Sequence, residues 1–566
     1  MNSTKLLSYL FRKSPLFRTV LWLAVVLVFV VSSVTFNFHT KKIPVIESIM
    51  PPVGAPGDLI IIKGKDFGSL RDTSYIEFGG SKLTASSYVS WTDNEIKVVL
   101  PANIKDGLVV VETKDARSKP AFFANTTAAP VAVSHNTQTT MPLITSISPE
   151  KIFPGTLLTI KGVNFGNSRE RSKVYFSTDR EIKKEDQSIQ SGSEDSDFIE
   201  ASDDDFNYVY WNDGEIRLYV PDGASSGFIY VETPKGKSAK RKLVMDSKAG
   251  KKSYISPRTY LVQFGVDIDE TNGDKDSDII LRCPRPFTTP AQPNVKMTEY
   301  TQEPVISEFQ HTIIHQTPGA KSALGKRTFQ QNFAITVYET RTQITAAKLE
   351  SGEKINDMLI SSFTKPDACV PSDSEEVVEL AKKITAAEKN PYNKAILIYN
   401  YMIQNFQIEK PSKKSGVSPV DLIKHKKGDA YDFAMIFTAM LRACGIPAVP
   451  DSGILVNSDL KSQNHWWAEF YLAGFGWVPV DPALGAGMEF QSWQKYYEPS
   501  QFYFGNLDGQ HIVFSRGWNE IKPSAPNNRI VQRQKSYALQ SIWEEASGKS
   551  IKYSSYWSNP VVIGVY

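Results

Sequence analysis

Three short motifs between Lys427 and Pro482 determine how the end of this 566-residue chain folds. Residues 428–434 read GDAYDFA, residues 464–469 read NHWWAE, and residues 476–482 read GWVPVDP. The first motif predicts a helix start, because an aspartate suits the N-cap and apolar residues follow at spacings of three and four. The other two motifs are rich in aromatic and β-branched residues, and they predict strands joined by a turn.

The order of these motifs also carries a chemical meaning. A helix N-terminus, a histidine and an aspartate, in that order, form the papain-like sequence of nucleophile, base and orienting acid. His465 and Asp481 are therefore the candidate catalytic residues. Ala430 stands at the helix start, where this order places the nucleophile.

The stretch resembles the core of the transglutaminase-like superfamily, which includes transglutaminases and bacterial cysteine peptidases. Its pattern is roughly Gly-x-Cys-x-Asp-Phe-Ala, His-Ala-Trp-x-Glu and Gly-Trp-x-x-x-Asp-Pro. The positions that match are Gly428, Asp432, Phe433, Ala434, His465, Trp467, Glu469, Gly476, Trp477, Asp481 and Pro482. The departure is Ala430, where the family has its nucleophilic cysteine. The resemblance implies a papain-like α+β fold whose Cys/His/Asp triad lacks its cysteine.

The missing cysteine closes the covalent route through an acyl-thioester. A thiol in the first helical turn would have its pKa lowered by the helix dipole, and alanine has no such group. Cys444 is 14 residues further along the same predicted helix, which is roughly 21 Å away at ~1.5 Å per residue. Cys283 and Cys369 lie outside the motifs. We therefore expect no cysteine to replace the nucleophile.

Other roles for the motif residues remain open. Four aromatic residues are candidates for lining a ligand-binding cleft, although the two that match the family pattern also suit the core: Tyr431, Trp466, Trp467 and Trp477. His465 and Asp481 could also be metal ligands together with His425, but their spacing is not that of a metal motif. We expect no metal and no cofactor.

The N-terminus contains an apolar segment. Residues 19–40 hold no Asp, Glu, Lys or Arg, and basic residues are more frequent before the segment than after it. This pattern predicts a cytoplasmic tail over 1–18 and a single transmembrane helix over 19–38, with the rest of the chain extracytoplasmic, in the periplasm or at the cell surface. The alternative is a signal peptide cleaved near residues 32–33.

An internal repeat precedes the core. Residues 56–68 match residues 154–166 at an offset of 98, and Trp91–Ile96 matches Trp211–Ile216 at an offset of 120. Alternating strands and Gly/Pro turns predict two small β-sandwiches, and the Pro-Gly…Gly-x-x-Phe-Gly pattern resembles IPT/TIG immunoglobulin-like domains. We place the domains at 43–124 and 141–247, with a Thr/Ala/Pro-rich linker over 125–140.

The second copy carries an acidic, Ser-rich insertion over residues 184–206. It is either a docking loop for a basic partner or for calcium, or a solvated insertion without its own structure. Beyond it, the sequence predicts a β-rich domain over 254–350, the transglutaminase-like core over 374–510 and C-terminal strands over 511–566.

Composition and motifs together favour one function over another. Apolar residues make up 41% of the chain, charged residues 22%, and the net charge is +3, so no nucleic-acid partner is indicated. The first interpretation is a membrane-anchored pseudoenzyme that binds or scaffolds a protein or cell-envelope polymer. The alternative is a hydrolase, peptidase or acyltransferase that uses His465 and Asp481 without the cysteine. Ala430 favours the first, and we do not expect an enzyme.

Overall fold

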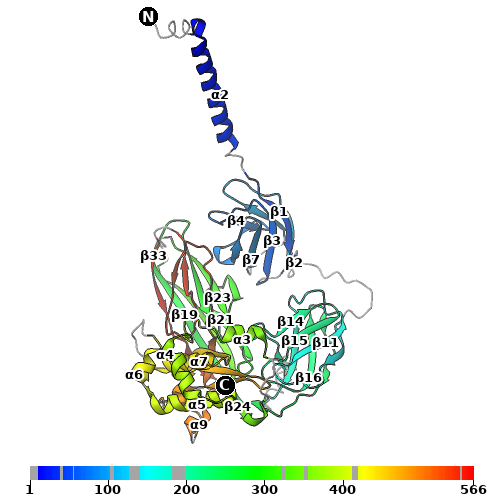
Figure 1. Ribbon diagram of the computed structural model, residues 1–566, viewed down its shortest axis with the longest axis vertical. Coiled ribbons are helices and arrows are strands. Elements are labelled where there is room, and N and C mark those ends of the chain that lie inside the picture. The colour runs from blue at the N-terminus through cyan, green and yellow to red at the C-terminus, as the bar shows by residue number, and fades with distance from the viewer. Residues whose placement is uncertain are drawn as a thin grey trace. The chain divides into compact units, whose positions relative to one another are not determined.

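The computed structural model describes most of the chain (Figure 1). The described residues are 11–37, 42–51, 53–54, 57–101, 107–125, 141–181, 198–320, 325–349, 355–410, 418–496, 498–548 and 551–566. The chain divides into two compact units, Met1–Pro130 and Val131–Tyr566. The first unit holds a helix and one β-sandwich, and the second holds the other β-sandwich, a β-domain and the core.

Helix α2 (Pro15–Asn37) contains most of the predicted transmembrane segment 19–38. Residue 38, residues 1–10 of the predicted tail and the side chains of 28–37 lie outside the described residues. Across the part of the chain that the structure describes, no helix is both long enough and apolar enough to cross a membrane, which takes ~20 apolar residues. The predicted transmembrane helix and single-pass topology are therefore not supported.

The first sandwich packs a four-stranded sheet in the order β1-β3-β7-β6 near a five-stranded sheet in the order β2-β9-β8-β4-β5. Its buried side chains, including Ile60, Ile62, Phe78 and Val109, form one apolar cluster. Its elements are β1 (Val45–Met50), β2 (Val53–Gly54), β3 (Leu59–Lys65), β4 (Tyr75–Phe78), β5 (Ser81–Lys82), η1 (Ala85–Ser87), β6 (Tyr88–Trp91), β7 (Glu95–Val99), β8 (Gly107–Glu112) and β9 (Ala121–Asn125).

The second sandwich repeats this plan with sheets in the orders β10-β11-β15-β14 and β13-β12-β16-β17, and β18 pairs with β16. Of the predicted insertion 184–206, residues up to 197 lie outside the described residues, and β13 pairs with β12. Its elements are β10 (Leu143–Ser148), β11 (Leu157–Val163), β12 (Lys173–Thr178), β13 (Phe198–Glu200), β14 (Tyr208–Trp211), β15 (Glu215–Tyr219), β16 (Ala224–Thr233), β17 (Gly236–Lys237) and β18 (Arg241–Leu243).

The glycine and phenylalanine of the repeated motif have a packing role. A Cβ on Gly64 would lie 1.9 Å from the Val45 carbonyl oxygen and 2.4 Å from the ring of Phe67, so only glycine fits there. The indole Nε1 of Trp91 donates to the Phe67 carbonyl at 3.0 Å and fixes the same corner. The second sandwich makes the same contacts through Leu143, Gly162, Phe165 and Trp211.

A β-domain follows, and the end of the chain completes it. Its sheets run in the orders β21-β24-β19-β33, with β34 also on β19, and β22-β23-β20-β32-β31. The predicted β-rich segment and most of the predicted C-terminal strands thus share their sheets. The strands are β19 (Gly250–Asn272), β20 (Asp278–Pro284), β21 (Asn294–Tyr300), β22 (Ile306–Phe309), β23 (Thr312–Pro318), β24 (Arg327–Ile344), β31 (Arg529–Val531), β32 (Glu544–Ala546), β33 (Lys552–Trp557) and β34 (Val561–Val565).

The core packs helices against an antiparallel sheet in the order β29-β28-β27-β30. Figure 1 shows α4, α5, α6 and α7 gathered at its side. The elements are η3 (Ala346–Lys348), α3 (Asp357–Phe363), α4 (Glu375–Thr385), α5 (Pro391–Asn405), β25 (Gln407–Ile408), α6 (Asp421–His425), β26 (Lys427–Gly428), α7 (Ala430–Ala443), β27 (Ala448–Val456), β28 (Ser462–Leu472), β29 (Gly476–Val480), α8 (Pro482–Gly485), α9 (Pro499–Phe502) and β30 (His511–Arg516).

Helix α7 is the central helix of this core, and residues from Ala430 to Arg442 are all buried. It packs on β27 and β28 and against α4 and α5. The chain leaves the helix at Gly445, whose φ of +76° is a left-handed conformation that glycine adopts without strain. Because α7 is enclosed on every side, its first turn is held at a fixed place beside the sheet.

Candidate functional site

The first turn of α7 has the architecture that activates a thiol, but it carries a methyl group. Asp429 is the N-cap: its Oδ1 accepts from the backbone N–H of Asp432 at 3.3 Å. In return, Asp432 Oδ2 accepts from the backbone N–H of Asp429 at 3.1 Å, which completes a capping box. Ala430 begins the helix and is 3% exposed. No nucleophilic atom stands at this position.

The sheet brings His465 and Asp481 together. His465 lies on β28 opposite Gly453 of β27, and Asp481 directly follows β29. Nε2 of His465 lies 2.6 Å from Asp481 Oδ2. Asp481 also caps α8, because its Oδ1 accepts from the backbone N–H groups of Ala483 at 3.0 Å and Leu484 at 2.9 Å. The base and the orienting acid that the sequence predicts are thus adjacent and held in place.

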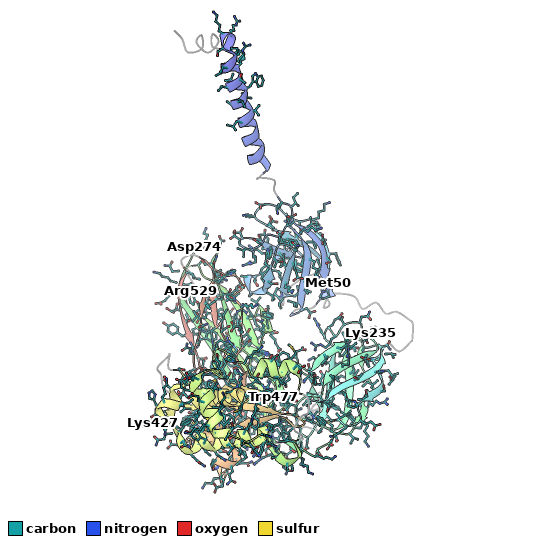
Figure 2. The ribbon with its side chains drawn as sticks, in the orientation of Figure 1. Met50, Lys235, Asp274, Lys427, Trp477 and Arg529 are labelled. Carbon is teal, nitrogen blue, oxygen red and sulfur yellow. The ribbon has the colours of Figure 1, made fainter. Side chains whose placement is uncertain are left out.

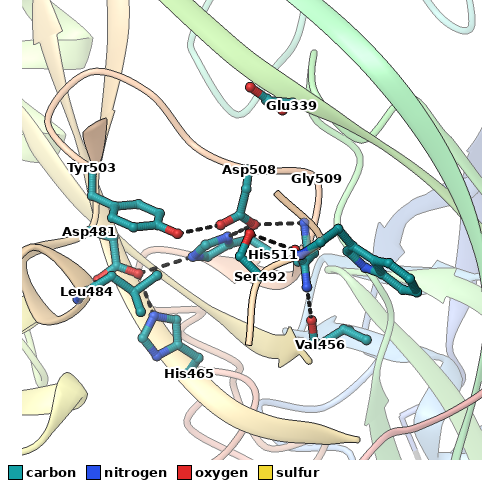
Figure 3. A network of polar contacts seen from close by, with 12 residues as sticks. Glu339, Val456, His465, Asp481, Leu484, Ser492, Tyr503, Asp508, Gly509 and His511 are labelled. Atoms are coloured by element: carbon teal, nitrogen blue, oxygen red, sulfur yellow. Dashed lines mark hydrogen bonds and ion pairs between the residues drawn. The ribbon is translucent and has the colours of Figure 1, made fainter. Parts of the chain in front are cut away.

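A second histidine extends this pair. His511, the first residue of β30, places Nε2 3.1 Å from Asp481 Oδ2 and Nδ1 2.9 Å from Asp508 Oδ1 (Figure 3). Tyr503 donates its hydroxyl to Asp508 Oδ2 at 2.8 Å. The result is a buried chain of polar contacts from His465 to Tyr503. Sequence reasoning missed its far half, because Asp508 and His511 stand in no motif.

Opposite charges stabilise each other in this buried network of polar contacts. Burial opposes ionisation of Asp481, but His465 and His511 outweigh it and hold the pKa of this carboxyl well below its usual value of 3.8. Burial likewise opposes a charged His511, yet Asp508 and Asp481 outweigh it and raise the pKa of the imidazole to about 9. At neutral pH the network therefore holds the His511 imidazolium beside the Asp481 carboxylate.

A lysine from the C-terminal region lies over the start of α7. Lys535 Nζ is 3.2 Å from Asp429 Oδ2, 3.3 Å from Asp432 Oδ1 and 5.0 Å from the centre of the Tyr431 ring. The next residue accepts a hydrogen bond at its carbonyl from Ser452 Oγ of β27, at 3.0 Å. The segment therefore contacts both the helix start and the sheet.

The pKa of Asp432, which lies two residues after Ala430, is also shifted. Burial, reinforced by the charge of Asp429, raises the pKa of Asp432 to about 6, while Lys535 acts in the opposite direction. Lys535 stands in no motif and lies 53 residues after Pro482, so its place beside the helix start could not be read from the sequence.

The four aromatic cleft candidates are all buried, and they divide into two places. Tyr431 and Trp466 meet edge to face at 5.5 Å beside the helix start, and Trp466 Nε1 has no hydrogen-bond partner among the described residues. Trp467 lies against both histidines, 6.0 Å from the ring of His465 and 5.1 Å from that of His511. Trp477 is elsewhere, where the second sandwich meets the core.

Trp477, labelled in Figure 2, contacts charged groups of that junction. Its Nε1 donates to Asp205 Oδ1 at 3.1 Å, and the Arg516 guanidinium lies 4.2 Å from its ring centre. Arg516 in turn donates to Asp205 at 2.8 Å and to Glu469 at 2.8 Å. A second buried ion pair joins Asp222 to Lys252 at 2.7 Å. The end of the acidic insertion thus contacts the core of the same chain.

The three cysteines differ in their burial and in their distance from the helix start. All three are free thiols: Cys283 and Cys369 are buried, and Cys444 is partly exposed at the end of α7 opposite Ala430. Burial raises the pKa of Cys369 to about 12, so its thiol is not ionised at neutral pH. Cys369 interacts with the Tyr431 side chain beside the helix start, so the expectation that no cysteine replaces the nucleophile stays a prediction.

A small cavity of about 50 Å³ lies beside His511. Its lining includes Asp451, Trp467, Asp508 and His511. Burial raises the pKa of Asp451 well above its usual value, and its Oδ1 has no hydrogen-bond partner among the described residues. His425, considered above as a metal ligand with His465 and Asp481, is instead exposed at the end of α6.

Comparison with known protein families agrees with the motifs. Residues 378–482 match the family model of the transglutaminase-like superfamily, and residues 44–128 and 142–180 match that of the IPT/TIG domain. The predicted domain families are thus confirmed. An uncharacterised protein of Haemophilus influenzae is 30% identical over 168 residues, which cover 25% of this chain and 46% of that protein. A cyclomaltodextrin glucanotransferase of Paenibacillus macerans is 35% identical over 86 residues, 15% of this chain and 12% of the enzyme.

Several solved structures are similar at low identity. A protein of Cytophaga hutchinsonii proposed to be a cysteine protease aligns with a TM-score of 0.35 at 16% identity, covering 55% of this chain and 93% of that one. The periplasmic domain of TgpA from Pseudomonas aeruginosa aligns with a TM-score of 0.24 at 14% identity, covering 40% and 86%. The chain spans less than half the length of the two curated relatives named above.

Proposed function

We propose that this protein, whose core is transglutaminase-like and whose preceding domains are IPT/TIG modules, is a catalytically inactive member of its fold that binds or scaffolds a protein or a cell-envelope polymer. The observation that carries the proposal is Ala430. The capped helix start, the base and the orienting acid are present, and the one atom that would attack a substrate carbonyl is missing.

The surroundings of Ala430 support the same conclusion. His465 is 1% exposed and Asp481 is fully buried, so neither can reach a substrate in this conformation. Lys535 forms ion pairs with both aspartates of the helix start, and its segment bonds to β27 as well. These contacts stabilise a closed site, which suits a structural or binding role better than turnover.

The kind of partner is inferred from the domain make-up. Two IPT/TIG modules beside a transglutaminase-like core fit a protein that recognises a macromolecule, and proteins and envelope polymers are the two classes we propose. Location outside the cytoplasm stays a prediction. It is tested by adding a protease to intact cells, and protection of both β-sandwiches from cleavage would contradict it.

The inactive state is tested by restoring the thiol. The full chain and Ala430→Cys are compared for amide hydrolysis and for amine transfer to a glutamine peptide, with Ala430→Cys/His465→Gln as the matched control. We expect no turnover by the native chain and thiol-dependent turnover by the single variant only. Turnover by the native chain that His465→Gln abolishes would contradict the proposal and support the cysteine-independent enzyme instead.

Binding is tested separately by cosedimentation of the native chain with isolated cell-envelope polymer. Retention in the pellet, competed by soluble fragments of the same polymer, is the expected result. If the chain stays in the supernatant and also forms no chemical cross-link to an envelope protein in cells, the binding role is wrong.

A further inference from the structure

Three side chains beside the missing nucleophile direct ligand atoms at one point. Among the described residues, His465, Asp481 and His511 form a group whose metal-ligating atoms all lie within 4.8 Å of one another. Nε2 of each histidine approaches the same carboxylate oxygen, Asp481 Oδ2, at 2.6 and 3.1 Å. Figure 3 shows both imidazoles turned toward that oxygen. All three residues are buried.

The remaining atoms of this group are already held by other partners. Asp481 Oδ1 accepts two backbone N–H groups of α8, which leaves Oδ2 for the shared point. Nδ1 of His511 lies 2.9 Å from Asp508 Oδ1, and Asp508 accepts from the Tyr503 hydroxyl. A carboxylate on the far nitrogen of a histidine is the usual outer partner of a metal-binding imidazole, because it fixes the ring and its tautomer.

We propose that His465, Asp481 and His511 bind one transition-metal ion, with Zn²⁺ the ion that suits them best. Two imidazole nitrogens and one carboxylate oxygen are ligands of Zn²⁺ and related divalent ions rather than of Ca²⁺ or Mg²⁺, which prefer oxygen ligands. Ligands at ~2.1 Å around a tetrahedral ion are roughly 3.4 Å apart. To hold the ion, Nε2 of His465 has to move away from Asp481 Oδ2, which is now 2.6 Å away, and the two Nε2 atoms, which lie within 4.8 Å of each other, have to approach by up to about 1.4 Å.

Metal binding breaks the hydrogen bonds between the two imidazoles and Asp481 Oδ2. Binding replaces the protons that the two Nε2 atoms share with Asp481 Oδ2, and these protons leave to solvent. A cavity of about 50 Å³ is lined by His511 and Asp508, but not by His465 or Asp481, and it has room for water, since one water needs roughly 10–15 Å³ of such space. The site does not require a thiol, but it shares His465 and Asp481 with the pair beside Ala430.

The test uses the full chain, purified without a histidine tag and stripped with a chelator. Zn²⁺ is titrated by calorimetry, and Co²⁺ is titrated while its visible absorption is recorded. We expect one ion per chain and the intense bands of four-coordinate Co²⁺. His511→Gln and Asp481→Asn should each weaken binding at least tenfold, and Asp508→Asn, which removes an outer partner, by about 10- to 100-fold.

Two controls separate the site from other histidines and from misfolding. His425→Gln, at an exposed position, and His315→Gln, at a buried position in the β-domain, should bind as the native chain does. The circular dichroism spectrum of each variant must match the native one. Absence of stoichiometric binding, or undiminished binding by folded His511→Gln, would overturn the proposal and leave a network of hydrogen bonds alone.

Discussion

Arg516 of the core donates a hydrogen bond of 2.8 Å to Asp205 of the second IPT/TIG domain, although the two residues are 311 positions apart in the chain. Asp205 belongs to the insertion for which the sequence left two interpretations open, a docking loop or a solvated segment. Its carboxylate also accepts from Trp477, a residue of the family motif. An acidic group of one domain therefore holds a motif residue of another.

Because of this contact, we expect substitution of Asp205 to lower stability more than substitution of the nearby Asp203. Asp205→Asn should lower the free energy of unfolding by about 1–2 kcal/mol, because it removes one charge from a largely buried pair while Arg516 keeps Glu469. Asp203→Asn is the matched control: its pair with Arg169 is at the surface and should be worth under ~0.5 kcal/mol. Urea denaturation measures both, and equal effects would contradict a structural role for Asp205.

A glycine in the middle of the core sheet makes a second prediction. A Cβ on Gly453 would lie 1.9 Å from the Ile512 carbonyl oxygen, so Gly453→Ala should displace β30 and with it His511. We expect a loss of roughly 2–4 kcal/mol in the free energy of unfolding, typical of a severe steric clash in a core.

Gly214→Ala is the control for this substitution, since a Cβ at Gly214 would lie 3.7 Å from the nearest atom, the Gly162 carbonyl oxygen. It should change stability by less than about 1 kcal/mol. Chemical denaturation followed by tryptophan fluorescence gives both values. A Gly453→Ala chain as stable as the Gly214→Ala chain would show that the strands can separate without cost.

His315 predicts how stability depends on pH. Burial lowers its pKa from 6.5 to about 4, so below pH 6.5 the unfolded chain binds a proton that the folded chain does not. The contribution of His315 to stability is complete above pH 6.5 and is lost as pH falls from 6.5 to about 4, by about 3 kcal/mol at ~1.4 kcal/mol per pKa unit.

His315→Gln should remove this contribution to the dependence of the unfolding free energy on pH, whatever the substitution does to stability at neutral pH. The measurement is urea denaturation at several pH values between 4 and 7.5. The exposed His425→Gln serves as the control and should keep the native slope. An unchanged slope in His315→Gln would mean that His315 is solvated in the folded chain.

The cysteines predict a pattern of chemical labelling. Cys444 is partly exposed, whereas Cys283 and Cys369 are buried and burial raises the pKa of both thiols. Iodoacetamide should therefore modify Cys444 first in the folded chain and all three in urea, as read by peptide mass spectrometry. Rapid modification of Cys369 under native conditions would show that the region beside Tyr431 opens to solvent.

Much of the core was predictable because its motifs are local. The N-cap at Asp429, the glycine after α7 and the His465–Asp481 pairing each follow from residue types at short or familiar spacings. The repeat predicted the two sandwiches for the same reason: a glycine beneath a phenylalanine ring is a local packing requirement.

What could not be predicted depends on contacts between distant segments. His511 meets Asp481 only because β30 pairs with β27, and Lys535 reaches Asp429 from 106 residues away. No periodicity in the sequence records either approach. The predicted transmembrane helix is unsupported for a different reason: no helix of the described residues is both long enough and apolar enough to cross a membrane.

The pairing of Asp205 with Arg516 also bears on how this protein can be inherited and recombined. The two IPT/TIG copies share the same contact between a tryptophan and a phenylalanine carbonyl. The second copy also bonds to the core through Asp205 and Arg516. Substitutions on either side of that contact will be epistatic. The second copy and the core therefore form one unit of exchange, and a chimera that takes one of them from a homologue must take the other as well.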